Sequence, residues 1–127
     1  MVANKTYEQE LRERHERQKH LDGIVSAAMD RVVVAIAGRQ PTLSSHFSYG
    51  ASAIHQRHLV TWYLFRTDAE WETAKQNGLI SDIERMTRAE LVSGGYTQEG
   101  AQQMMVSFTS DEDIQRKTGG DHWTYFK

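Results

Sequence analysis

The first long segment with a regular apolar pattern has the period of a helix. Its apolar positions are spaced by three or four residues: Leu21, Val25, Ala28, Val32 and Ile36. This spacing places them on one stripe of a helix. Gly23 costs about 1 kcal/mol relative to alanine inside a helix, so it is a candidate for a kink or break. Val32–Ala37 alone has the β-branched composition of a strand, but the stripe continues through it in phase, which favours helix. Gly38 and Pro41 then mark the helix end.

Residues 4–22, which lead into this stripe, are rich in helix formers, and residues 4–20 are almost free of apolar side chains. An acidic residue precedes a basic one by four positions in three pairs, each worth about 0.2–0.5 kcal/mol to a helix: Glu8–Arg12, Glu10–Arg14 and Glu13–Arg17. We predict a polar helical arm over residues 1–20. It is either a solvated extension of the domain, the more common case, or an arm that embraces a partner.

Two segments then show the alternation of strands. Ser45–Ile54 is apolar on one face and polar on the other, which predicts a half-buried strand with a bulge or a close backbone approach at Gly50. His55–His58 is short enough for a hairpin connection. The following segment, His58–Phe65, is apolar on both faces. It is therefore predicted to be a central strand, with one face packed by helices of this chain and the other covered by a second subunit or a ligand.

Helix-capping signals divide the next part of the chain. Thr67 and Glu70 form a capping box that predicts a helix over residues 68–77, and Ser81 and Glu84 form a second box that predicts a helix to about residue 93. Residues 96–100 are predicted to be a turn or one short helical turn.

The C-terminal part is predicted to alternate strand, short helix and strand. Met104–Thr109 has a strand composition, Ser110–Asp113 begins an acidic-headed helix, and Asp121–Lys127 alternates like a last strand. The order predicts a single α+β domain over residues 1–127. We expect two layers, with the long N-terminal helix and further helices packed on a small, mainly antiparallel sheet of about four strands.

Composition narrows the class of protein. The chain has 127 residues, a net charge of −2 and no cysteine. It therefore lacks the basic excess of a nucleic-acid-binding protein, and disulfide scaffolds, thiol nucleophiles and cysteine-ligated metals are excluded. The longest apolar run, six residues, is too short for a membrane helix, and the first residues lack the apolar core of a signal peptide. We expect a soluble cytoplasmic protein that binds neither nucleic acid nor membrane.

Candidate catalytic chemistry is sparse. The six histidines are scattered, without a spacing that predicts a metal site, and no phosphate-binding or nucleophile-elbow motif is present. Asp121 and His122 are neighbours on a predicted strand, so their side chains point to opposite faces. We predict neither a cofactor nor a metal. A hydrolase-like or metal-dependent enzyme that uses His58 or His122 stays open as an alternative.

The aromatic residues are the more informative candidates. A ligand pocket or partner surface is predicted to draw on six side chains: Trp62, Tyr63, Trp123, Tyr125, His58 and His122. Burial in the core is the ordinary role for most of these aromatics. Even so, two tryptophans on a small sheet whose helices do not obviously cover both faces favour a homo-oligomer, with a dimer as the first expectation.

The C-terminal third also carries a resemblance. Residues 106–114 and 120–127, the acidic helix start and the closing aromatic segment Gly-Asp-His-Trp-Thr-Tyr-Phe-Lys, resemble the tail of small uncharacterised bacterial proteins carried on mobile gene cassettes. This resemblance implies a bacterial, accessory, cytoplasmic protein and assigns no activity or residue role. The sequence thus favours a non-enzymatic binding or interaction protein that self-associates through its sheet or its N-terminal helix. A small-molecule-binding protein with an aromatic-lined pocket is the main alternative.

Overall fold

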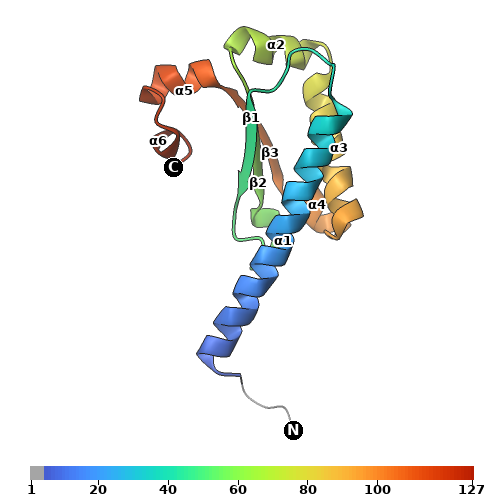
Figure 1. The fold of residues 1–127 in the computed structure, drawn as a ribbon, viewed down its shortest axis with the longest axis vertical. Coiled ribbons are helices and arrows are strands. Elements are labelled where there is room, and N and C mark those ends of the chain that lie inside the picture. Colours follow the sequence, from blue (N-terminus) through green and yellow to red (C-terminus); the bar gives the residue numbers. More distant parts are fainter. Residues whose placement is uncertain (1–4) are drawn as a thin grey trace.

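A computed structural model describes residues 5–127 of the chain. It contains a long N-terminal helix, shorter helices and one three-stranded sheet, as an α+β domain (Figure 1). The helices are α1 (Tyr7–Ala35), α2 (Asp68–Gln76), α3 (Leu79–Gly94), α4 (Gln98–Gln103), α5 (Asp111–Thr118) and α6 (His122–Tyr125), with a short 3-10 helix η1 (Gln56–His58). The strands are β1 (Ser45–Tyr49), β2 (Val60–Phe65) and β3 (Met105–Ser110). Residues 1–4 of the predicted arm lie outside the described residues.

Helix α1 is continuous from Tyr7 to Ala35, so the break considered at Gly23 does not occur. Its start is fixed by a capping box in which Thr6 and Gln9 exchange side-chain to backbone hydrogen bonds. The predicted stripe is the buried face of its second half, and the segment from Val32 to Ala35 is helical as favoured. The first half extends beyond the sheet and the other helices (Figure 1). We call its first ten residues, 7–16, the free arm.

Strand β2 lies at the centre of the sheet, as predicted. It pairs antiparallel with β1 and parallel with β3. The parallel pairing is possible because helices α2, α3 and α4 lie between β2 and β3 and carry the chain back to the end of the sheet where β2 begins. The sheet is therefore mixed and has three strands rather than four, because the predicted last strand over 121–127 is helix α6 instead.

The link between β1 and β2 is longer than the predicted hairpin. β1 ends at Tyr49, and residues 50–59 form a turn that contains η1. Gly50 has φ +125°, and a Cβ there would lie 2.1 Å from the carbonyl oxygen of His58. The close backbone approach predicted at Gly50 is confirmed, and it marks the end of the strand rather than its middle.

The inner face of the sheet packs against α1 and α3 and forms the core. On β2 this face carries three residues that are almost completely buried, Thr61, Tyr63 and Phe65, and Leu59, directly before β2, is buried as well. The Tyr63 hydroxyl contacts Thr87 of α3 at 2.7 Å, and Thr87 donates to the Ile83 carbonyl at 2.7 Å. Tyr63 thus joins the central strand to α3.

The first of the two predicted capping boxes is confirmed in part, and the second is not formed. The Thr67 hydroxyl accepts from the Glu70 amide at the start of α2, although the Glu70 carboxylate accepts from the Arg66 amide rather than from that of Thr67. The second predicted box is wrong. Helix α3 begins at Leu79, directly after a left-handed Gly78, so Ser81 already lies inside it.

Candidate functional site: an apolar surface on the outer face of the sheet

The face of the sheet opposite α1 and α3 carries the apolar side chains that the core does not use. Strand pairing places Phe47 beside Trp62 and Tyr49 beside Val60, on the side away from the buried Tyr63. β1 does have an apolar and a polar face, as predicted, but its apolar face does not pack against the helices. His46 and Ser48 point toward the helices, and the apolar residues of β1 point outward, because the register follows the buried residues of β2.

Helix α6 folds back onto this outer face. Phe126, the residue that ends α6, packs edge-on against Phe47 and Trp62, with ring centroids 4.9 and 4.8 Å apart. The Trp62 indole N–H donates to the Tyr49 hydroxyl at 3.2 Å, so both polar aromatic groups are satisfied within the surface. We call the whole set the outer apolar surface: Phe47, Tyr49, Val60, Trp62, Met105, Trp123 and Phe126.

The tail formed by α5 and α6 is held by a cluster of hydrogen bonds at its base. The Tyr125 hydroxyl bonds to the Thr109 hydroxyl at 2.6 Å and donates to the buried Asp113 carboxylate, which also accepts from Arg116 and Lys117. The bond from Tyr125 and the two cations hold the pKa of Asp113 down at about 2, against the effect of burial. Burial and the Asp113 carboxylate raise the pKa of Tyr125.

A second acidic residue extends this cluster to α2. Asp68 accepts from the Ser110 hydroxyl at 2.5 Å and from Arg116 at 2.8 Å, and these bonds lower its pKa. Because each of these carboxylates already accepts from two or more donors, the cluster holds the tail against α2 and β3. We interpret it as a structural clasp rather than a reactive site.

Between the tail and β1 lies an open groove of about 520 Å³. Its lining is Phe47, Tyr49, His122, Trp123, Phe126 and Lys127. We call it the aromatic groove. Trp123 stands at its rim and is 79% exposed, while Tyr49 is 44% exposed and Met105, further along the outer face, is 58% exposed. The lining contains one basic side chain, Lys127, and the polar rings of His122 and Tyr49, and no Asp or Glu is among its six residues.

The six side chains predicted as binding candidates are separated by the fold. Trp62 lies half-buried in the outer apolar surface, and Trp123 and His122 line its groove. Tyr63 is a core residue on the inner face, and Tyr125 belongs to the clasp. His58 ends η1 near His55, with ring centroids 6.0 Å apart.

The sequence prediction missed five members of the surface: Phe47, Tyr49, Val60, Met105 and Phe126. Alternation within β1 did place Phe47 and Tyr49 on one face, but alternation alone does not indicate which face the helices cover. The sequence therefore showed that Phe47 and Tyr49 share a face, but it did not show that this face points away from the helices.

Residues 5–127 also bear on three other candidate features: a metal site, a membrane-spanning helix and a paired Asp121 and His122. Residues 5–127 contain no group of three or more His, Asp or Glu side chains that could hold a metal ion. None of the helices among these residues has both the length and the apolarity that a bilayer crossing requires. Asp121 caps α6 by accepting from the Thr124 amide and hydroxyl, so it orients the helix and not the neighbouring His122.

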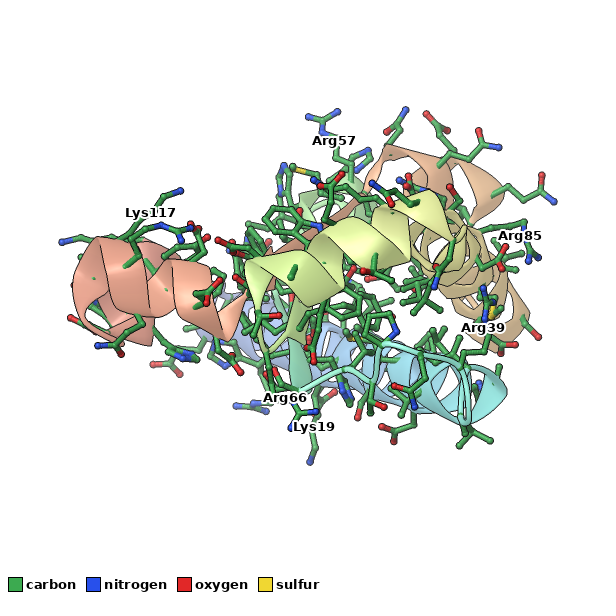
Figure 2. The ribbon with its side chains drawn as sticks, turned by 90° about the horizontal axis from the view of Figure 1, so that it is seen from above. Lys19, Arg39, Arg57, Arg66, Arg85 and Lys117 are labelled. Atoms are coloured by element: carbon green, nitrogen blue, oxygen red, sulfur yellow. The ribbon has the colours of Figure 1, made fainter. Side chains whose placement is uncertain are left out.

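The basic side chains labelled in Figure 2 do not gather on one face. The six labelled in Figure 2, Lys19, Arg39, Arg57, Arg66, Arg85 and Lys117, lie on different sides of the molecule. Two of them, Arg39 and Arg85, share the Asp82 carboxylate at 2.7 and 3.3 Å. This distribution lacks the positive stripe typical of nucleic-acid-binding surfaces.

Comparison with known proteins gives no relative from which to transfer a role. No protein-family model, curated protein or solved structure matches the chain. The outer apolar surface therefore has to be interpreted from its own geometry.

Proposed function

We propose that this is a non-enzymatic, cytoplasmic binding protein that self-associates by covering its outer apolar surface with a second copy of the chain. The observation that carries the proposal is the exposure of large apolar side chains on the outer face of the sheet and on the helix α6 that folds onto it. Trp123, Met105 and Tyr49 are 79%, 58% and 44% exposed, and the groove beside Trp123 and Tyr49 is walled by further aromatic rings. Aromatic and methionine side chains are the residues enriched in the centres of protein interfaces.

The size of the surface sets the expected affinity. A nearly exposed tryptophan presents roughly 200 Å², and the three most exposed residues together present roughly 400 Å², the size at which patches on monomers mark binding sites. Burying that area on two copies contributes about 20 kcal/mol, of which about 4–15 kcal/mol is lost in translational, rotational and side-chain freedom. The remainder of about 5–16 kcal/mol includes the roughly 8 kcal/mol of a micromolar complex. Because the buried area of about 800 Å² over both copies is small for an interface, we expect a dissociation constant at the weak end of this range, micromolar or above.

Sedimentation velocity over a dilution series tests the proposal. The wild type should pass from monomer to dimer between about 1 and 300 µM, and Trp123→Ser should raise the dissociation constant at least about tenfold. Val34→Ser is the matched control. Val34 is also a highly exposed apolar residue, at 75%, but it lies near the C-terminal end of α1 and outside the outer apolar surface. A wild type that stays monomeric throughout this range would overturn the proposal.

One observation favours a second candidate, a small-molecule-binding protein. The aromatic groove, at about 520 Å³, has the volume of pockets that hold small ligands, although it is open to solvent on one side. In that case Trp123→Ser would abolish the binding of an aromatic probe such as anilinonaphthalene sulfonate, while the wild type remained monomeric. The oligomeric state of the wild type therefore separates the two candidates.

A further inference from the structure

We infer that the part of the second copy that fills the aromatic groove is the free arm of α1, and that two chains exchange their arms reciprocally. This inference rests on the proposed self-association and identifies the surfaces that meet in it. It unites the two features that a single chain leaves without a packing partner, the arm and the groove.

The free arm is an ordered helix without a packing surface of its own. In the described residues, side-chain hydrogen bonds from α1 to the rest of the chain begin at Arg17 and Gln18, which bind the link between β1 and β2. From residue 7 to residue 16 every side chain is exposed except Leu11, which is half-buried. Ten helical residues extend about 15 Å beyond this anchor. The arm continues the packed half of the 29-residue helix α1, so it needs no nucleation of its own, and a docking surface would bury the apolar side chains that it leaves exposed.

The tip of the arm has an apolar pair with acidic side chains on both sides. Tyr7, which is 77% exposed, and Leu11 are four residues apart and therefore adjacent on one helical face. Glu8 and Glu10 flank this pair, three residues from Leu11 and Tyr7 respectively, and neither has an ion-pair partner among residues 5–127. With four carboxylates and two arginines, the free arm carries a net charge of −2 when its histidine is neutral.

The aromatic groove is complementary to this tip. Its walls are aromatic rings, which suit a tyrosine and a leucine, and its lining includes the Lys127 ammonium and the His122 ring N–H, which suit flanking carboxylates. An amphipathic helix whose anchors are spaced i and i+4 is the ordinary occupant of an apolar groove. Both the apolar and the charged features therefore match.

The groove of the same chain is out of reach of its arm. The arm is part of one straight helix, and its tip lies at the end of the molecule away from α5 and α6 (Figure 1). Filling the groove from within the chain would require α1 to break. A second copy supplies the arm without such a break, and a two-fold axis makes the exchange reciprocal.

Charge reversal on each side of the contact, followed by mixing, is the test. The tip variant Glu8→Lys/Glu10→Lys and the groove variant His122→Glu/Lys127→Glu should each raise the dissociation constant of the dimer at least about tenfold, because each places like charges in contact. An equimolar mixture should restore association to within about twofold of the wild type, since each mixed dimer pairs opposite charges at both of its sites. Glu72→Lys/Glu90→Lys changes the net charge as much as the tip variant does, away from both surfaces, and should leave the dissociation constant unchanged.

The outcomes separate this inference from the proposed function. If the wild type dimerises and the tip variant dimerises equally well, the arm does not fill the groove, while self-association stands. If both variants weaken the dimer and the mixture stays dissociated, the arm inference is also overturned, because a lysine that merely frays the first turn of α1 would not be rescued by the groove variant. A monomeric wild type would overturn both.

Discussion

Replacing Tyr63 with phenylalanine removes one buried hydroxyl from the contact between the central strand and α3. A threonine hydroxyl has a single proton, and that of Thr87 is donated to the Ile83 carbonyl at 2.7 Å. The bond of 2.7 Å between Tyr63 and Thr87 must therefore have Tyr63 as its donor. Because of this direction, removing the Tyr63 hydroxyl and removing the Thr87 hydroxyl should have different costs in stability.

The asymmetry gives different magnitudes for the two single variants. Tyr63→Phe removes the donor and leaves the Thr87 hydroxyl bonded to Ile83, so we expect a loss of about 1 kcal/mol in the free energy of unfolding. Thr87→Val leaves the Tyr63 hydroxyl buried without an acceptor, so we expect about 2–3 kcal/mol. The double variant should cost less than the sum of the two single variants by about 1 kcal/mol or more, because no orphaned hydroxyl remains.

Urea unfolding of the four proteins measures this cycle. Equal costs for the two single variants, or additivity in the double variant, would refute the assigned direction of the bond. A ligand-binding role for Tyr63 would also require the hydroxyl to be reachable, whereas the residue is completely buried.

The pH dependence supplies an independent check on Tyr63. Burial raises its pKa from 10.0 to about 12, and the bond to Thr87 offsets part of that increase. A pKa that is higher in the folded state contributes stability that is complete below pH 10 and is lost as the pH rises from 10 through 12. The wild type should therefore lose roughly 2 kcal/mol more than Tyr63→Phe by pH 12. Parallel stability curves for the two proteins in this interval would contradict the assignment.

Three further predictions concern the backbone and the clasp. Gly50→Ala should destabilise the fold by about 3 kcal/mol or more in urea unfolding, because its Cβ would collide with the His58 carbonyl of η1. Gly38→Ala has open space around it and only the strain of φ +87°, so it should cost about 1–2 kcal/mol in the same assay. Arg88→Met should cost about 2 kcal/mol of unfolding free energy, because the Arg88 guanidinium donates to three carbonyls at the end of α4. Arg85→Met removes only an exposed ion pair and should cost less than about 1 kcal/mol. Equal losses would refute the capping role of Arg88. The depressed pKa of Asp113, about 2, contributes stability that is complete above pH 3.8 and is lost as the pH falls through 2. Hydrogen exchange of the α6 amides in the wild type should therefore accelerate over that interval. In Asp113→Asn the same amides should exchange fast already at pH 7. Unchanged exchange in the asparagine variant would show that the clasp does not hold the tail.

Local signals in the sequence were sufficient for much of the framework. The apolar stripe from Leu21 onward identified the buried half of α1, and it resolved Val32–Ala35 as helix in spite of its β-branched residues. Thr67 and Ser110 were identified as helix starts because a cap is a contact between residues three positions apart. These features depend on neighbours along the chain, which is why the sequence contains them.

Other elements were decided by contacts across the fold. Residues 121–127 alternate like a strand, but Asp121 caps a helical turn there, and Phe126 and Tyr125 then reach β1, β2 and the clasp, contacts that no local pattern predicts. Ser81 and Glu84 have the spacing of a capping box, yet Gly78 starts the helix earlier. In the first case long-range packing selected one of two structures compatible with the local pattern, and in the second a competing local start at Gly78, where the Asn77 side chain accepts from the Leu79 amide, took precedence.

The sequence by itself determined that β2 is apolar on both faces and central, and that the arm before Leu21 is polar and helical. Only the tertiary structure decided what lies on each face of that strand. The inner face is filled by α1 and α3 around Tyr63, and the outer face is covered in part by the tail of the same chain, which leaves Trp123 and the aromatic groove exposed. The physical reason is that alternation fixes which side chains share a face, whereas the pairing of distant strands and the path of the tail fix which face meets water.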